Sequence, residues 1–554
     1  MPFRNIETHF SQAPQAKVAR SSFKYNKPTK FTMNAGDLVP FLVEEVLPGD
    51  TFDLSVSKVV RLSTSLHPTM DNLYMDTYFF FVPNRFLWDN WTKFMGENDK
   101  AWTQNVTYNV PYMELGVNGD CTYLSPQSIL QYLGIPAFNN NSKKNTKISI
   151  LPFNAYCKVW NDWFRSENLV DECPIYTGDG HFPNAYFASY TTFMANFGVT
   201  AYINGVDSCL KVAKFADYFS RALPQPQKGA DVLIPAGGDV VYQPSGFDTS
   251  NPPLWFINPN GTQPYNGTGL KFNNGKLQDS TGSTVAYDPK GTLGFEGLEI
   301  TVNNLRLAMQ TQKLLERDAR GGTRYIELIK SHFNVVSPDL RLQRSEYLGG
   351  HRTLINMSEV IQTSETTSNS PLGQLAGRSL TSGVEKSFIK SFTEHGFIIG
   401  VCCVRPDRTY SQGIEKYWTR FDRLDHYFPV LANIGEMGIK NKEIYLTGAS
   451  ETVSPDDVFG YQEAWAEYRT QRGRCTGYMQ PGITGSLASW TYSDEYSSTP
   501  FLSASWLYQG KAEVDRTLAI PSSTAPQFIC DFLTFGKAVR PMPVYSIPGL
   551  VDHN

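Results

Sequence analysis

The sequence predicts an all-β fold, a barrel or sandwich that carries long insertions. Many apolar runs are short and end at Gly or Pro turns, as around Pro48-Gly49, after which Phe52, Leu54 and Val56 alternate with polar residues. Aromatic residues make up 13% of the 554 residues, which favours strands and extensive contact surfaces. Helical periodicity occurs in only a few segments, which we place in the connections between strands.

Further strands follow from apolar runs bounded by turn residues. Leu73 to Val82 ends in an apolar run, as expected for a strand covered on both faces. Phe397–Val401 and Phe528–Leu533 predict two later strands. The Ser/Thr/Gly-rich segment 356–387 predicts a long loop, and residues 414–428 predict a polar contact loop.

Three segments predict helices. Residues 153–169 carry a broad apolar face that includes Trp160 and Trp163, with Asn154 as the N-cap. A helix through residues 305–315 should end at Gly321 in a left-handed conformation, and a shorter helix should follow over 323–333.

Bulk properties exclude several classes of protein. The formal net charge of −4 argues against a chain that coats nucleic acid with its whole surface, so such a role must be local. The eight cysteines lack metal-site spacing and predict buried thiols, without a metal or cofactor. We also expect no signal peptide and no membrane span.

A basic N-terminal arm is predicted over residues 1–36. Its cations are interleaved with aromatic residues, a pattern suited to phosphates and unpaired bases. An ordinary solvated arm, or one lying along a neighbouring subunit, fits equally well. The candidate nucleic-acid contacts are Arg4, Lys17, Arg20, Lys24, Lys27 and Lys30.

Residues 228–293 differ in composition from the rest of the chain. They are rich in Gly, Pro, Asn, Thr and Ser, as in a disordered linker, but carry more aromatic residues than disorder usually does. We therefore predict a surface-projecting, turn-rich lobe whose aromatic residues include Trp255, Phe256 and Tyr265.

The densest arginine and glycine pattern lies in residues 314–350. Two interpretations stay open: a solvated helical hairpin with surface ion pairs, or a loop fixed against a neighbouring subunit. On the second interpretation, the candidate interface residues are Arg165, Arg317, Arg320, Arg324, Arg341 and Arg344.

Catalytic motifs are missing from the sequence. There is no phosphate-binding GxxxxGK[ST] loop, no GxSxG elbow and no HExxH helix. Carboxylates such as Asp422 with Asp425, or Glu327 with Glu346, are only nominal candidates for acid–base work. We expect no enzyme; the rival hypotheses are a carbohydrate-binding β-sandwich that uses the aromatic residues of 228–293, and a β-rich hydrolase.

Several ordered motifs carry a resemblance over almost the whole chain. They are VLPGDTF at 46–52, FFFVPNRFLWDNW at 79–91, LPFNAYCKVWNDWFRSENL at 151–169, LLERDARGGTRYIELIKSHFNVVSPDLRLQRSEYLGG at 314–350, EHGFIIG at 394–400, VFGYQEAWAEYR at 458–469 and MPVYSIPGLVDH at 542–553. Together they resemble the major capsid protein of gokushovirus-type microviruses, small isometric phages with single-stranded DNA. One departure is Ser345, where the family pattern leads us to expect proline.

The resemblance implies a viral eight-stranded antiparallel jelly roll over residues 37–554, with helices in its inter-strand insertions. It further implies self-assembly into a T=1 icosahedral capsid around circular single-stranded DNA, in a virion assembled in the bacterial cytoplasm. By this resemblance, the 228–293 lobe would form threefold protrusions that meet a host-surface receptor, with Trp255, Phe256 and Tyr265 as the candidate receptor-facing residues. Internal scaffolding and minor capsid or pilot proteins are the other implied partners.

Overall fold

The computed structural model describes residues 18–97, 107–116, 121, 124–138, 144–195, 209–232, 302–363, 366 and 371–545, and the backbone of short strands between 237 and 299. The chain divides into two compact units. One comprises Met1–Pro226 together with Asp318–Asn554, and the other comprises Gln227–Arg317.

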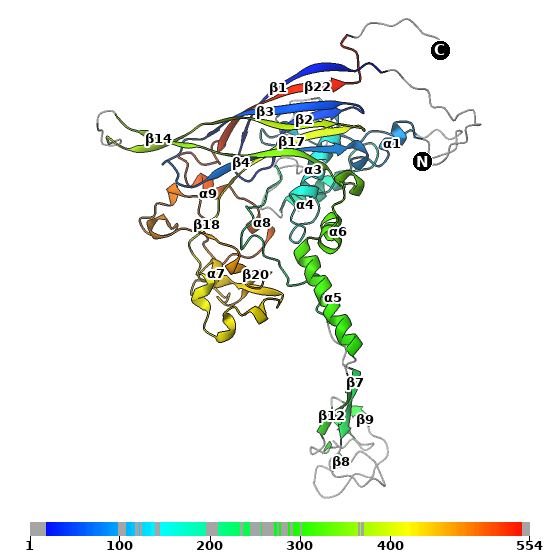
Figure 1. Cartoon of the computed structure of the whole chain (residues 1–554), viewed down its shortest axis with the longest axis vertical. Coiled ribbons are helices and arrows are strands. Elements are labelled where there is room, and N and C mark those ends of the chain that lie inside the picture. Colours follow the sequence, from blue (N-terminus) through cyan, green and yellow to red (C-terminus); the bar gives the residue numbers. More distant parts are fainter. Residues whose placement is uncertain are drawn as a thin grey trace, which may run out of the picture. The chain divides into compact units, whose positions relative to one another are not determined.

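Two four-stranded antiparallel sheets form the centre of the larger unit, as far as the described residues show (Figure 1). The first has the order β1 (Ser21–Met33), β22 (Phe528–Arg540), β3 (Thr51–Leu62), β16 (Thr381–Ser391). The second has the order β13 (Glu346–Leu354), β4 (Leu73–Pro83), β17 (Gly396–Pro406), β2 (Val39–Val46).

Strand order identifies the architecture. If these eight strands are numbered along the chain, the sheets read 1-8-3-6 and 5-4-7-2, so most successive strands change sheet. This is the arrangement of a jelly roll, and it confirms the predicted fold class.

The core lies between the two sheets because one side of each strand is apolar. In β3 every second residue is buried, the pattern of a strand with one face on a core. Aromatic rings pack from sheet to sheet, with centroids 5.0 Å apart for Phe41 and Phe532 and 5.5 Å apart for Phe79 and Phe388. Helix α3 (Leu151–Trp163) contacts the other side of β4 and β17, which explains their continuous apolar runs.

The helices lie in the connections between strands, as predicted. The β4–β13 connection holds, besides α3, α1 (Trp91–Phe94), β5 (Tyr112–Leu115), α2 (Ile129–Tyr132), β6 (Thr146–Ser149), α4 (Asn184–Ala195), α5 (Val302–Gly321) and α6 (Tyr325–Phe333). The β17–β22 connection holds β18 (Thr409–Tyr410), β19 (Glu436–Lys440), α7 (Asn441–Ile444), β20 (Val458–Glu463), β21 (Gly473–Arg474), α8 (Ala504–Leu507) and α9 (Ala512–Asp515).

The smaller unit contains short paired strands and most of α5. Its pairs are β7 (Gly237–Gln243) with β12 (Thr292–Glu299), β8 (Phe256–Ile257) with β11 (Ala286–Tyr287), and β9 (Lys271–Asn273) with β10 (Lys276–Gln278). Of the candidate receptor-facing residues, Phe256 lies in β8, whereas Trp255 and Tyr265 lie outside the described residues.

The predicted loop over 356–387 is wrong. Strands β14 (Met357–Ile361) and β15 (Leu375–Ser379) form an antiparallel ribbon, and β16 then joins the first sheet. The ribbon is mostly exposed, so its strands need no buried apolar face and their Ser, Thr and Gly content resembles that of a loop.

Two helix ends also differ from prediction. Asn154 lies buried within α3 instead of capping it, and its side-chain amide donates to the carbonyl oxygens of Leu87 (3.3 Å) and Tyr176 (2.8 Å). Gly321 is the last residue of α5, and the left-handed residue is Gly322 (φ +99°). Either glycine can follow the basic last turn, so composition alone did not fix the end.

The thiol prediction is confirmed, since all eight cysteines are free and buried. Trp160 is buried in the core and Trp163 packs against it, as expected from their helical spacing. Within the described residues, no helix combines the length and apolarity needed to cross a membrane.

Candidate functional surfaces

The basic N-terminal residues divide between different environments. Residues 21–33, which belong to the predicted arm over 1–36, form β1 and pair throughout with β22. Lys24 and Lys30 lie on the exposed side of β1, whereas Lys27 lies on the other side. Arg4 and Lys17 fall outside the described residues.

Two of these cations are held by backbone oxygens. Lys27 Nζ donates to the carbonyl oxygen of Val43 (2.8 Å) and lies 3.5 Å from the Glu44 carboxylate. Arg20 donates to the carbonyl oxygen of Gly49 and to Thr51 Oγ1 (3.3 Å). Lys24, which is exposed, is therefore better placed than Arg20 and Lys27 to meet a phosphate, and Lys30 is exposed but paired with Asp531 (3.0 Å).

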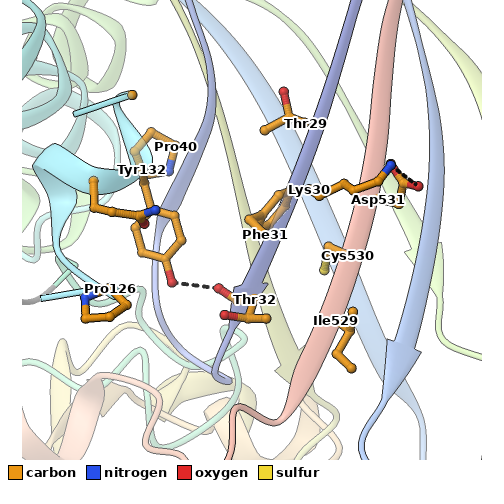
Figure 2. A pocket seen from close by; sticks show the side chains of 12 residues that line it. Thr29, Lys30, Phe31, Thr32, Pro40, Pro126, Tyr132, Ile529, Cys530 and Asp531 are labelled. Carbon is orange, nitrogen blue, oxygen red and sulfur yellow. Dashed lines mark hydrogen bonds and ion pairs between the residues drawn. The ribbon is translucent and has the colours of Figure 1, made fainter. Parts of the chain in front are cut away.

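An open groove of about 700 Å³ lies beside the end of β1 (Figure 2). Tyr132 closes one side, and its hydroxyl donates to the carbonyl oxygen of Thr32 (2.6 Å). Burial raises the pKa of Tyr132, so its hydroxyl stays a donor near neutral pH. The charged residues of the lining are Lys30 and Asp531, which form an ion pair at 3.0 Å. Such a lining offers apolar contact and brings no set of reactive groups together.

Arginines of the predicted hairpin connect α6 to the end of α3. Arg324 donates to the carbonyl oxygens of Asn161 (3.0 Å) and Arg165 (3.1 Å) and pairs with Glu167. Arg165 itself donates to the carbonyl oxygen of Val170 (3.1 Å) and to Glu172 (3.1 Å). These arginines stabilise the fold of one chain.

Ser345 forms a second connection between this segment and α3. Its backbone N–H and its hydroxyl both donate to Asp162 (2.8 Å each), and its oxygens accept from the Trp163 indole (3.1 Å). Beside it, the Arg344 guanidinium lies 3.8 Å from the centre of the Trp163 ring. Proline has neither a backbone N–H nor a hydroxyl and could donate neither hydrogen bond. Ser345 therefore fixes this loop by hydrogen bonds, whereas the proline expected from the family pattern would fix it through its rigid ring.

Arg320 connects the end of α5 to strands far along the chain. It donates to Glu436 in β19 (2.9 Å) and to Gln462 in β20 (2.7 Å). Arg317 and Arg341, by contrast, are exposed, and their side chains make no hydrogen bond or ion pair with the described residues. Of the candidate interface arginines, these two are therefore best placed to contact another molecule.

Replacing Gly321 by valine is expected to destabilise the α5–α6 junction. A Cβ at Gly321 would lie 2.6 Å from Ser331 Cβ and 2.8 Å from Ser331 Oγ, so a larger side chain must push α6 away. Overpacking of this kind costs about 1–3 kcal/mol. Gly383→Val is the control, because a Cβ at that strand position meets no atom within 4 Å. Equal thermal midpoints for the two variants would contradict the expected clash.

Sequence reasoning missed the apolar character of residues 417–434, which we call the contact segment. It contains the short 3₁₀ turns η4 (Arg423–Asp425) and η5 (Pro429–Leu431), and it begins within η3 (Lys416–Thr419). Eight large apolar side chains in it are exposed, among them Phe421 (85%) and Val430 (93%): Tyr417, Trp418, Phe421, Leu424, Tyr427, Phe428, Val430 and Ile434. The predicted polar contact loop therefore exposes large apolar side chains beside exposed charged residues such as Asp422 and Arg423, whereas Lys416 and Arg420 are half-buried.

Lys416 and Arg420 attach the contact segment to the rest of the chain. Arg420 donates to Glu467 (2.7 Å), and Lys416 lies 3.7 Å from the same carboxylate. The Trp465 indole donates to the carbonyl oxygen of Leu431 (2.9 Å). An exposed surface held in this way is already ordered before a partner arrives, which lowers the entropy cost of binding.

Three of the four nominal catalytic carboxylates, those of Asp425, Glu327 and Glu346, have structural partners. Asp425 Oδ2 accepts the backbone N–H groups of Phe421 (3.0 Å) and Asp422 (2.9 Å), and these bonds lower the pKa of Asp425. Glu327 caps α6, and Glu346 pairs with Lys390.

Comparison with known proteins decides the family. Residues 11–550 match the family described as Capsid protein (F protein). The chain belongs to this capsid protein family. The protein is therefore a structural component of a virion and not an enzyme.

Curated relatives agree with this assignment over almost their whole lengths. Capsid protein VP1 of Bdellovibrio phage phiMH2K is 37% identical, and that of Chlamydia phage 1 is 36% identical, each over 98% of both chains. Capsid protein VP1 of Spiroplasma virus 4 is 35% identical over 99% of this chain and 98% of its own. The match to microvirus capsid proteins confirms the resemblance found in the sequence, and it replaces the carbohydrate-binding and hydrolase hypotheses.

Proposed function

We propose that copies of this capsid protein assemble into a closed T=1 icosahedral shell that encloses circular single-stranded DNA. The observation that carries the proposal is the contact segment, which exposes eight large apolar side chains between residues 417 and 434. A second copy of the chain is the partner that a capsid subunit meets on many sides. Many modest contacts then stabilise the shell together, because closure engages all of them at once.

Contact with the genome is proposed to be local and sequence-independent. The net charge of −4 disfavours a generally basic surface, so the cations that meet DNA must gather on one face. The exposed Lys24 and Lys30 of β1, and Arg4 and Lys17 before it, are the candidates. Binding through phosphates should weaken as salt concentration rises.

Electron microscopy of the purified, expressed protein, combined with a nuclease-protection assay, tests the proposal directly. We expect uniform isometric particles of T=1 size that protect single-stranded DNA from nuclease. Particles of another symmetry, or particles whose nucleic acid is fully digested, would contradict the shell geometry or the DNA content respectively. Scaffolding and minor capsid or pilot proteins, which the family resemblance implies, would be supplied by co-expression if particles fail to form.

The lobe over 228–293 is proposed to attach the virion to a host-surface receptor. Its strands pair with one another inside the smaller unit, Gln227–Arg317, which supports a module separable from the jelly roll. Such inserted modules tolerate removal better than core elements do.

Replacing residues 232–290 by a short Gly/Ser linker is therefore expected to leave particle yield unchanged while adsorption to host cells falls to background. Particle counts by electron microscopy and a cell-adsorption assay measure the two effects. A control that replaces only residues 279–285 by a linker of equal length should assemble normally. If the large deletion yields no soluble subunit, the lobe contributes to the core and the proposal is wrong.

A further inference from the structure

The solvent side of the first sheet brings together lysines that are far apart in sequence. In the β1–β22 register Lys24 lies directly opposite Lys537, and both side chains are exposed. Neither lysine forms an ion pair or side-chain hydrogen bond with the described residues. Like charges directly opposite each other in a sheet are destabilising, so this pair is a natural position for a bridging anion.

An aromatic ring lies on the same face, next to this pair. Phe535 stands opposite Asn26 of β1 and opposite Ser55 of β3, and Ser55 in turn pairs with Lys386 of β16. The Phe535 side chain is half-buried and makes no ring contact with the described residues. A ring on an exposed sheet face, with cations around it, is an arrangement that stacks an unpaired base and holds the adjoining phosphates.

This side of the first sheet carries a net positive charge, whereas the whole chain carries a net negative charge. Its two carboxylates are both near lysines: Asp531 is 3.0 Å from Lys30 and Asp53 is 3.7 Å from Lys386. The same side of the sheet carries five cations, which gives an excess of three positive charges over the two carboxylates, whereas the whole chain has a net charge of −4. The cations are Lys24, Lys30, Arg61, Lys386 and Lys537. The excess favours a polyanion over a neutral partner.

We infer that this face, with Phe535 at its centre and Lys24 and Lys537 beside it, binds single-stranded nucleic acid by base stacking and phosphate contact. The inference rests on the proposed enclosure of single-stranded DNA and names the surface that touches it. It adds residues of β16 and β22, which sequence reasoning about the N-terminal segment did not include. Exposed apolar side chains on the same face, Val384 (68%) and Ile529 (56%), suit the planar faces of bases but also suit a protein, so the experiment must separate the two.

The test measures binding of a fluorescent 20-nucleotide oligothymidylate to the soluble full-length chain by anisotropy, over a series of salt concentrations. The K24Q/K537Q double variant should bind more weakly and lose about 1.4 from the slope of log affinity against log salt, since each phosphate contact contributes about 0.7 for a single strand. Phe535→Leu should weaken binding about tenfold with the slope unchanged. It should leave the affinity for an abasic oligonucleotide of the same length unaltered, because that ligand has no base to stack.

Lys511→Gln is the matched charge control, since Lys511 is exposed and lies outside this sheet. It should behave as the unaltered chain does, and thermal melts should show all variants folded. Unchanged binding and slope in both test variants, with normal binding by the unaltered chain, would overturn this inference alone. Loss of self-association with DNA binding intact would reassign the face to a contact between copies and also overturn it. Failure of the unaltered chain to bind the oligonucleotide, with no nuclease-protected DNA in particles, would instead overturn the proposed DNA enclosure.

Discussion

The F421D/V430D double variant is expected to remain folded as a single subunit and to form no shells. Both side chains are almost fully exposed in the isolated chain, so replacing them removes little packing and should change the stability of the subunit by about 0.5 kcal/mol or less. In a contact between copies, each aspartate would bury a charge without a partner, at a cost of several kcal/mol per ion. Because a closed shell repeats the contact, the penalty is multiplied over all subunits.

Sedimentation velocity and electron microscopy measure this effect, and circular dichroism checks the fold. The control is F421L/V430I, which keeps the surface apolar at similar volume and should assemble normally. If the aspartate variant yields shells at the normal level, the contact segment does not lie between subunits. If both variants fail, the shape of these side chains matters as well as their apolarity.

Local sequence patterns predicted the strands that have one buried and one exposed face, and the strands that are buried on both faces. Phe397–Val401 lies within β17 and Phe528–Leu533 lies within β22. Short apolar runs between turn residues are typical of buried strands, which is why these two were predicted. The exposed β14–β15 ribbon gives no such signal. Its strands are held by backbone pairing and carry side chains typical of loops.

Local sequence patterns do not predict which distant strands pair with each other. β1 pairs with β22 across almost the whole chain, and no periodicity in Ser21–Met33 indicates that partner. The jelly-roll order was predicted only through the family resemblance. The same limit applies to the basic segment, where alternation along β1 puts Lys27 on one side and Lys24 on the other, a distinction that composition lacks.

The arginines illustrate a further limit. Arg320 is 116 residues from Glu436 in the sequence, and Arg324 is 163 residues from Asn161. Charge counts within 314–350 could only suggest local ion pairs or contacts with another subunit. The structure adds a third role for Arg320, Arg324 and Arg344, which connect distant parts of one chain. Arg165 instead makes local contacts, with Val170 and Glu172.

A buried charge cluster joins the β4–β13 and β17–β22 connections of the larger unit. Asp494 accepts hydrogen bonds from Lys214 (2.9 Å), from the Tyr496 hydroxyl (2.7 Å) and from Arg408. All three charged residues are buried. Burial by itself raises the pKa of Asp494, but the positive charges of Arg408 and Lys214 outweigh burial and lower it to about 2.

Replacing Asp494 by alanine is expected to destabilise the subunit more than any other single change considered above. The substitution leaves the buried Lys214 without its ion-pair partner and Arg408 with only Glu513, at 4.0 Å, which costs about 3–5 kcal/mol. Urea denaturation of the soluble chain measures the free energy of unfolding. Asp531→Ala is the control, since its ion pair with Lys30 is exposed and should contribute about 1 kcal/mol or less.

The pH dependence of unfolding offers an independent check on the same cluster. The folded pKa of about 2 lies below the value of about 3.9 for an unfolded aspartate, so the unfolded chain binds the proton first as the solution is acidified. The stabilisation from Asp494 is thus complete above about pH 4, and about 2–3 kcal/mol of it is lost as the pH falls toward 2. Asp494→Asn cannot titrate, so its stability should fall less steeply than that of the unaltered chain over this range. Parallel pH profiles for the two proteins would show that Asp494 is not the group whose protonation weakens the fold in acid.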